Sequence, residues 1–179
     1  MRKIICLTII VTLLLVCLSS CSGYNKIMIA HLSAPENYHT YKAVVVDMYH
    51  QNPQTREFLR NFASSDCCEQ DVTIVIKLWE NIEEILPFLG SNPDPDVPLE
   101  SYEISLFVTA DNSKVLYENG FYEAVSIGDK IEVTASNWIY MDGNFFYVAQ
   151  VVFDDVVYLN FEDGLHNILD MMNRNKSLC

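Results

Sequence analysis

Four aromatic side chains around residue 140 are the strongest candidates for contact with a ligand. Asp142-Gly143 is typical of a two-residue β-turn, and the apolar runs on either side predict a hairpin. Because side chains alternate across a strand, one face of this hairpin carries an aromatic quartet: Trp138, Tyr140, Phe145 and Tyr147. An exposed quartet would be a platform for a sugar ring or a partner protein. The competing interpretation is that a helix covers these rings as part of the core.

The same turn predicts the register of the hairpin. Taken literally, Asp142-Gly143 pairs Tyr140 with Phe145 and Trp138 with Tyr147. The opposite face is apolar and is the predicted core side: Ile131, Val133, Ala135, Ile139, Phe146 and Val148. A β-bulge in either strand would exchange the two faces.

One acidic loop is a weak candidate for a metal site. Asp94, Asp96 and Glu100 lie in or beside a proline-rich segment, and their oxygens are of the kind that calcium prefers. They lack the central glycine and the ligand spacing of an EF-hand, so a solvated acidic loop is the simpler interpretation. We expect no metal and no cofactor.

Two pairs of adjacent carboxylates could serve acid–base chemistry. Asp154-Asp155 and Glu162-Asp163 have the residue types that a small hydrolase would need. However, adjacent residues of a strand point to opposite faces, which argues against convergence. The sequence also contains no P-loop, nucleophile-elbow serine, zincin helix or glycine-rich dinucleotide turn. These observations favour a non-catalytic protein.

Three cysteines in the body of the chain allow several redox states. Cys67 and Cys68 are adjacent and could form a strained vicinal disulfide, or one of them could pair with Cys179. Thiols that are unpaired or only incidentally paired are the simpler interpretation. The four histidines are isolated and show no metal-ligand spacing.

The first 21 residues resemble the signal peptide of a bacterial lipoprotein. Arg2 and Lys3 precede an apolar run over 4–18, and Leu18-Ser19-Ser20-Cys21 has the pattern of a lipobox. The resemblance implies cleavage before Cys21, acylation of Cys21 with chains such as palmitate, and a domain on the extracytoplasmic side of the cell membrane or outer membrane. The alternatives are an ordinary secretory signal and a retained anchor helix.

Charge and composition narrow the classes of partner. The chain is 50% hydrophobic and 12% aromatic, which excludes a disordered protein. Removal of 1–20 would leave nine Lys and Arg against 24 Asp and Glu, a net charge of −15. Such a domain is repelled by anionic lipid head groups and by nucleic acid. We therefore expect attachment through the lipid alone.

The remaining pattern predicts a small domain with alternating elements. We expect strands over 41–49, 71–79, 102–109, 114–117 and 151–161, and helices in 52–62, 81–89 and the C-terminal segment. The predicted organisation is a signal peptide over 1–20, a tether over 21–37, one domain over 38–172 and a tail over 173–179.

Residues 125–135 resemble the turn and strand of an OB-fold or a related small β-barrel. The turn is Gly128-Asp129, and alternating apolar residues follow it. The resemblance implies an α+β domain, mainly antiparallel, that forms an OB-like barrel with two or three short helices including a C-terminal one. It also implies ligand binding on one face, often of oligonucleotides or oligosaccharides. We expect a lipid-anchored envelope binding module for a glycan or an envelope protein; the alternative is a small envelope hydrolase that uses loop carboxylates.

Overall fold

The computed structural model describes residues 26–51, 55–60, 62, 70–80, 98, 102–140 and 143–175, with the backbone alone for 137–140, 143–145 and 175. Seven strands form one sheet: β1 (Tyr38–Gln51), β2 (Phe58–Leu59), β3 (Val72–Leu78), β4 (Glu103–Val108), β5 (Lys130–Tyr140), β6 (Gly143–Phe153) and β7 (Val156–Leu159). Their order is β2-β1-β3-β4-β6-β5, and β7 pairs with β6. The domain is therefore α+β with a mainly antiparallel sheet, as the sequence predicts.

The sheet closes in a ring because β1 has two partners. Its first half pairs with β5 from Tyr38 to Val44, and its second half pairs with β3 from Ala43 to His50. A register shift between Val45 and Asp47 marks a bulge, which lets a strand bend between two partners. The ring is not a regular barrel, since β4 and β6 share a parallel contact of only two residue pairs.

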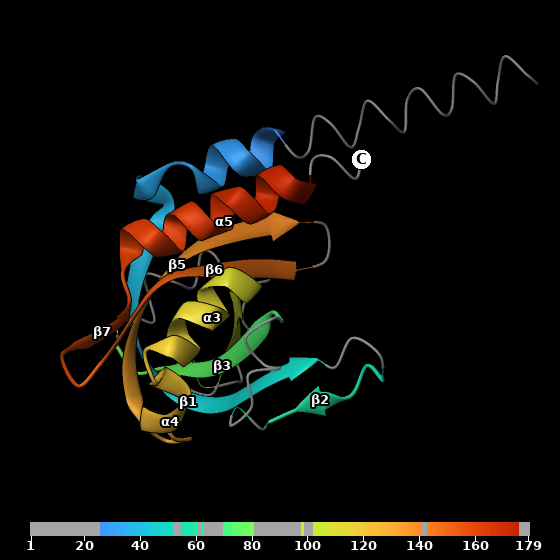
Figure 1. Cartoon of the computed structure of the whole chain (residues 1–179). Coiled ribbons are helices and arrows are strands. Elements are labelled where there is room, and N and C mark those ends of the chain that lie inside the picture. The colour runs from blue at the N-terminus through green and yellow to red at the C-terminus, as the bar shows by residue number, and fades with distance from the viewer. Residues whose placement is uncertain are drawn as a thin grey trace, which may run out of the picture.

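The helices pack against this ring, and the first and the last of them lie together at one end of the molecule (Figure 1). The first covers 26–32 and is followed by η1 (Pro35–Asn37); the others are α3 (Ala110–Glu118), α4 (Phe121–Ala124) and α5 (Phe161–Asn175). The C-terminal helix was expected. Among the described residues, no helix is long and apolar enough to cross a membrane.

Two expected elements have the other secondary structure. The segment 114–117, predicted as a strand, belongs to α3, because Thr109 acts as its N-cap and accepts a hydrogen bond from Asn112 N at 3.3 Å. Phe58 and Leu59, predicted in a helix, form β2 and pair with Gln51 and His50. The spacing of apolar residues within these two segments indicated neither the cap at Thr109 nor the pairing with β1.

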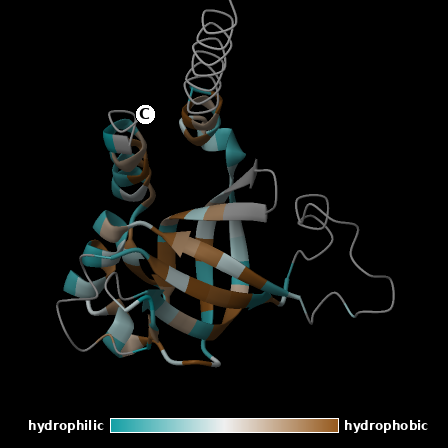
Figure 2. Ribbon diagram, turned by 90° about the vertical axis from the view of Figure 1, so that its right-hand side faces the viewer, coloured by the Kyte–Doolittle hydropathy of each residue, from teal (hydrophilic) through white to brown (hydrophobic). Residues whose placement is uncertain are grey.

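Two hydrophobic clusters stabilise the fold. The larger one fills the ring with side chains of every long strand, among them Val45, Ile76, Leu106 and Val133. Figure 2 shows the apolar residues concentrated on these strands. The smaller cluster lies outside the ring, where helix 26–32 and α5 pack on β6, and it includes the fully buried Leu32 and Ala149. Part of the segment that the sequence placed in a tether is thus a packed helix.

Candidate functional site

A row of side chains crosses four strands on the outer surface of the sheet. The register pairs Tyr49 of β1 with Thr73 of β3, Thr73 with Phe107 of β4, and Phe107 with Tyr147 of β6. Neighbouring strands are about 4.8 Å apart, so the four positions span about 14 Å. None of the four is fully buried. The topology therefore builds an extended aromatic surface from residues that lie almost 100 positions apart in the chain.

The rings at both ends of this row are held edge to face. Phe58 of β2 packs against Tyr49 with centroids 4.9 Å apart and an interplanar angle of 72°. Phe107 and Tyr147 are 5.3 Å apart at 77°. Phe58 is 59% exposed, although a phenylalanine normally gains free energy by leaving water. We call the hollow beside Tyr49, Phe58, Thr73 and Phe107 the aromatic groove; its volume is about 450 Å³.

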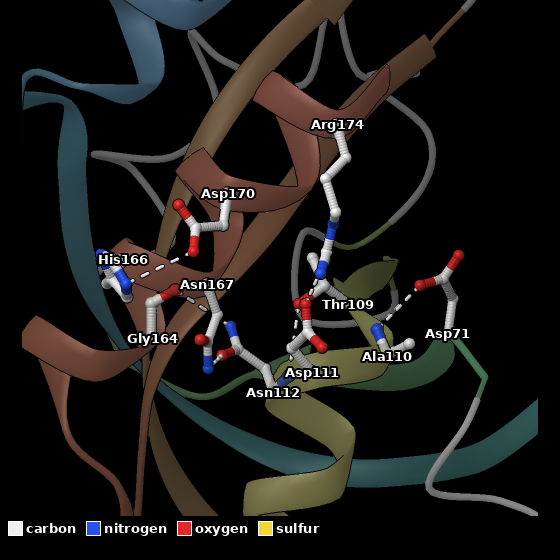
Figure 3. A network of polar contacts seen from close by, with 10 residues as sticks. All are labelled: Asp71, Thr109, Ala110, Asp111, Asn112, Gly164, His166, Asn167, Asp170 and Arg174. Carbon is white, nitrogen blue, oxygen red and sulfur yellow. Dashed lines mark hydrogen bonds and ion pairs between the residues drawn. The ribbon is translucent and has the colours of Figure 1, made fainter. Parts of the chain in front are cut away.

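Polar side chains complete the aromatic groove. Gln51, Gln70 and Asp71 line it together with the hydroxyl-bearing Thr73. Asp71 Oδ1 accepts a hydrogen bond from Ala110 N at 2.8 Å, which holds the carboxyl at the start of α3 (Figure 3). Burial raises the pKa of Asp71, and this backbone hydrogen bond only partly opposes the effect. The groove thus combines ring faces with amide, hydroxyl and carboxyl groups, which is suitable for a ligand with hydroxyls on an apolar frame.

A second hollow, of about 650 Å³, lies beside α4. Phe62 and Tyr122 stack there with centroids 4.5 Å apart at 14°. Asp47 and Arg60 form a two-pronged ion pair, with Nη2 to Oδ2 at 2.7 Å and Nε to Oδ1 at 2.9 Å. Hydrogen bonding from Arg60 lowers the pKa of Asp47. Because the charges of Asp47 and Arg60 compensate each other, this ion pair has little attraction left for a charged ligand. We therefore regard the aromatic groove as the better candidate site.

A third hollow, of about 260 Å³, contains the adjacent carboxylates Asp154 and Asp155. Both have positive φ angles, 49° and 62°, and together they make the two-residue turn between β6 and β7. Across the hollow, Lys130 Nζ lies 3.7 Å from the centre of the Trp79 ring. Asp154 and Asp155 therefore serve as turn residues. As neighbours in one turn they do not face each other across a site, as a general acid and a general base would.

The other predicted carboxylate pair also has a structural role. Asp163 N donates to Asn160 Oδ1 at 3.0 Å, and Asn160 Nδ2 donates to Asp163 Oδ2 at 2.5 Å. This reciprocal pair caps the start of α5, with Glu162 also in the first turn. Across the part of the chain that the structure describes, no cluster of three or more His, Cys, Asp or Glu could hold a metal ion.

The hairpin itself is present, with a register that differs from the predicted one. Trp138 pairs with Phe145, and Tyr140 pairs with Gly143, instead of the predicted pairs Trp138–Tyr147 and Tyr140–Phe145. Each of these residues thus pairs with a partner two positions earlier than the Asp142-Gly143 turn predicts. A bulge at Ala149, between the pairs Thr134–Gln150 and Ala135–Val148, then adjusts the register further along.

Only one member of the predicted quartet has a described side chain. Tyr147 is half-buried, touches Phe107 and lies at the smaller hydrophobic cluster beside α5. Tyr147 therefore lies between the smaller cluster and the row that continues through Phe107, and the two interpretations of the quartet stay predictions. The side chains of Trp138, Tyr140 and Phe145 lie outside the described residues, as do Cys21, Cys67, Cys68, Cys179, Asp94, Asp96 and Glu100.

Sequence reasoning missed Tyr49, Phe58, Thr73 and Phe107 as site residues. The alternation of residues 41–49 could have placed Tyr49 on the face opposite Met48, but no local pattern joins it to Phe107. Only the strand order brings these residues together. Comparisons of this chain with protein-family models, curated proteins and solved structures found no match.

Proposed function

We propose that this protein is a lipid-anchored binding module of the bacterial cell envelope, and that the aromatic groove binds a glycan strand. The observation that carries the proposal is the row Tyr49–Thr73–Phe107–Tyr147, which places rings beside hydrogen-bonding side chains over about 14 Å. Sugar rings stack on aromatic faces through their apolar C–H edges, while their hydroxyls need polar partners. The lipobox motif at Leu18–Cys21 supports the anchor.

Charge favours a glycan over nucleic acid. The whole chain carries a net charge of −13, and Arg60, Lys42 and Lys77 each lie within 4 Å of a carboxylate. A phosphate backbone would need clustered cations that are available to it. A neutral or weakly charged saccharide needs none. The same groove could hold a protein loop, but the two side-chain amides, the hydroxyl and the carboxyl that line it suit a hydroxyl-rich ligand better.

We further propose that the ring is organised like the OB-type domains which residues 125–135 resemble. In chain order the ring strands are β1, β3, β4, β5 and β6, and α3 follows the third of them. OB-type domains bind ligands on the face of their second and third strands. In this chain those are β3 and β4, which carry Thr73 and Phe107 of the groove.

The hydrolase alternative has weaker support. Asp154 and Asp155 serve a turn, and Asp163 caps α5. Among the described residues, Asp71 is the one carboxyl that lines the groove, and a glycosidase of the usual kind needs two carboxyl groups on opposite sides of the scissile bond. Binding without hydrolysis is therefore the outcome that we expect for a saccharide.

Titration calorimetry of the intact protein with soluble oligomers of N-acetylated hexosamines tests the binding proposal. Phe107→Ala and Phe58→Ala should each weaken binding about tenfold, which corresponds to about 1.4 kcal/mol. Ile127→Ala is the matched control, because Ile127 is 65% exposed and lies in the hollow beside α4 rather than in the groove. Equal losses in the Ile127 and Phe58 variants, or no saccharide binding by the native protein, would contradict the proposal. Capture of a protein through the groove instead would identify the other class of ligand.

A further inference from the structure

Helix 26–32 is part of the folded domain and is held there by apolar packing. Leu32 is fully buried, and Met28 and Ile29 pack around it against α5. Tyr38 at the start of β1 donates a hydrogen bond from its hydroxyl to Leu32 O at 3.0 Å. Because of these contacts, the folded domain begins at Lys26, the first residue of the helix.

The length of chain between this point and Cys21 is short. Five residue steps separate Cys21 from Lys26, and even a fully extended chain spans at most about 18 Å over five steps. If the whole of 21–37 were free, the reach would be about 55 Å by the same rule. A domain of about 150 residues has a radius of gyration of about 15 Å, so its opposite ends are about 40 Å apart. A lipid on Cys21 would therefore hold one particular end of the domain near the bilayer.

We propose that the surface formed by the start of helix 26–32 and the end of α5 lies against the lipid bilayer, while α4 and β2 face away from it. The inference rests on the proposed lipidation of Cys21. Figure 1 shows helix 26–32 and α5 at one end of the molecule, and α4 and β2 at the other. We call the former the anchor end.

The side chains of the anchor end suit a lipid surface. Ile27 is 64% exposed although it belongs to a helix with a buried apolar face. The exposed Lys26 places positive charge here, in a chain that is otherwise strongly acidic, while Arg174 near the end of α5 is paired with Asp111. Glu162 and Asp163 lie in the first turn of α5, at the far end of that helix. An acidic domain held within about 18 Å of anionic head groups has the lowest repulsion when its cations face them.

Fluorescence quenching on vesicles tests the orientation. The protein is prepared with its native lipid, with Cys67, Cys68 and Cys179 replaced by Ser, and with one new cysteine for a fluorophore. Asn173→Cys reports the anchor end, because it lies 152 positions from Cys21 and comes close only through packing. Ile127→Cys reports the other end from a similarly exposed site. Nitroxide on the lipid head groups should quench the fluorophore at 173 several-fold more strongly than that at 127.

Two further variants connect this difference to the docked helix. Leu32→Asp should undock the helix and reduce the difference between the two sites. Because that variant could also unfold the domain, an insert of about 15 Gly and Ser residues between Asn25 and Lys26 lengthens the chain without altering the fold and should have the same effect. Full acylation by intact mass with equal quenching at both sites would overturn the orientation alone. An unmodified Cys21 would overturn the anchor and, with it, this inference.

Discussion

Asn167 Nδ2 donates a hydrogen bond to Asn112 Oδ1 at 2.9 Å, which joins two helices that are 55 residues apart in the chain. Asn112 is completely buried, and its own amide donates to Val148 O at 3.0 Å and to Gly164 O at 3.1 Å. The side chain thereby links α3, β6 and α5 (Figure 3). Because both N–H groups of the Asn112 side-chain amide donate and its oxygen accepts a hydrogen bond, its burial costs little.

We expect Asn112→Ala to destabilise the domain by about 3 kcal/mol, since it removes three hydrogen bonds of a fully buried side chain and leaves a void between α3, β6 and α5. Asn119→Ala is the control. Asn119 Nδ2 donates to Tyr158 O at 2.7 Å in an exposed position, so water can replace the bond and the loss should be below about 1 kcal/mol. Urea titration measures both. Equal losses would show that the buried network has no special role.

Gly164→Ala should also destabilise the domain, by about 2 kcal/mol. In an exposed helix the same change gains about 1 kcal/mol, because alanine is the better helix former. Here a Cβ atom at Gly164 would lie 2.0 Å from Ala149 O, where α5 crosses β6. Ala149→Gly should not rescue the variant, since the contact is with the backbone of Ala149. A more stable Gly164→Ala protein in thermal melts would show that α5 can move away from β6.

The Asp47–Arg60 ion pair predicts a pH-dependent contribution to stability. Arg60 lowers the pKa of Asp47 below its ordinary value of 3.8. A carboxyl with a lowered folded-state pKa adds stability above its ordinary pKa, and that stability is lost as the pH falls through the lowered value. Arg60→Gln should therefore cost a small amount of stability at pH 7 and less at pH 2, where Asp47 is more protonated.

Arg56→Gln is the control for Arg60, because Arg56 forms no ion pair among the described residues. Urea midpoints of the two variants and the native protein, measured at pH 7 and pH 2, give the comparison. The effect at pH 7 should be small, since exposed ion pairs contribute little. A loss in Arg60→Gln that is the same at both pH values would show that the arginine acts through packing alone.

Cys21→Ser tests the anchor. With the native residue, intact mass of the membrane-extracted protein should show a chain that begins at Cys21 and carries added acyl mass. The serine variant should lose that mass and leave the membrane fraction or retain residues 1–20. A native mature protein that is free of acyl chains would contradict lipidation.

Some features of this protein could be read directly from the sequence. The α+β class, the strands at 41–49, 71–79 and 102–109, the C-terminal helix and the hairpin near 140 all follow from local periodicity. The lipobox is also a local pattern, of 21 contiguous residues, and lipidation stays a prediction. Local patterns suffice in these cases because strand alternation and helical spacing reflect burial of one face, whichever partner covers it.

Tertiary structure decided the rest. Residues 114–117 became part of α3 because the Thr109 cap begins a helix whose Leu116 is fully buried in the core, and Phe58 joined a strand because β1 offered a free edge. The aromatic groove is the clearest case. Tyr49, Thr73 and Phe107 become neighbours only through the order β1-β3-β4, and pairing between distant strands depends on the closure of the whole sheet. No local periodicity contains that information, because the residues of the site share a row across strands and not a segment of chain.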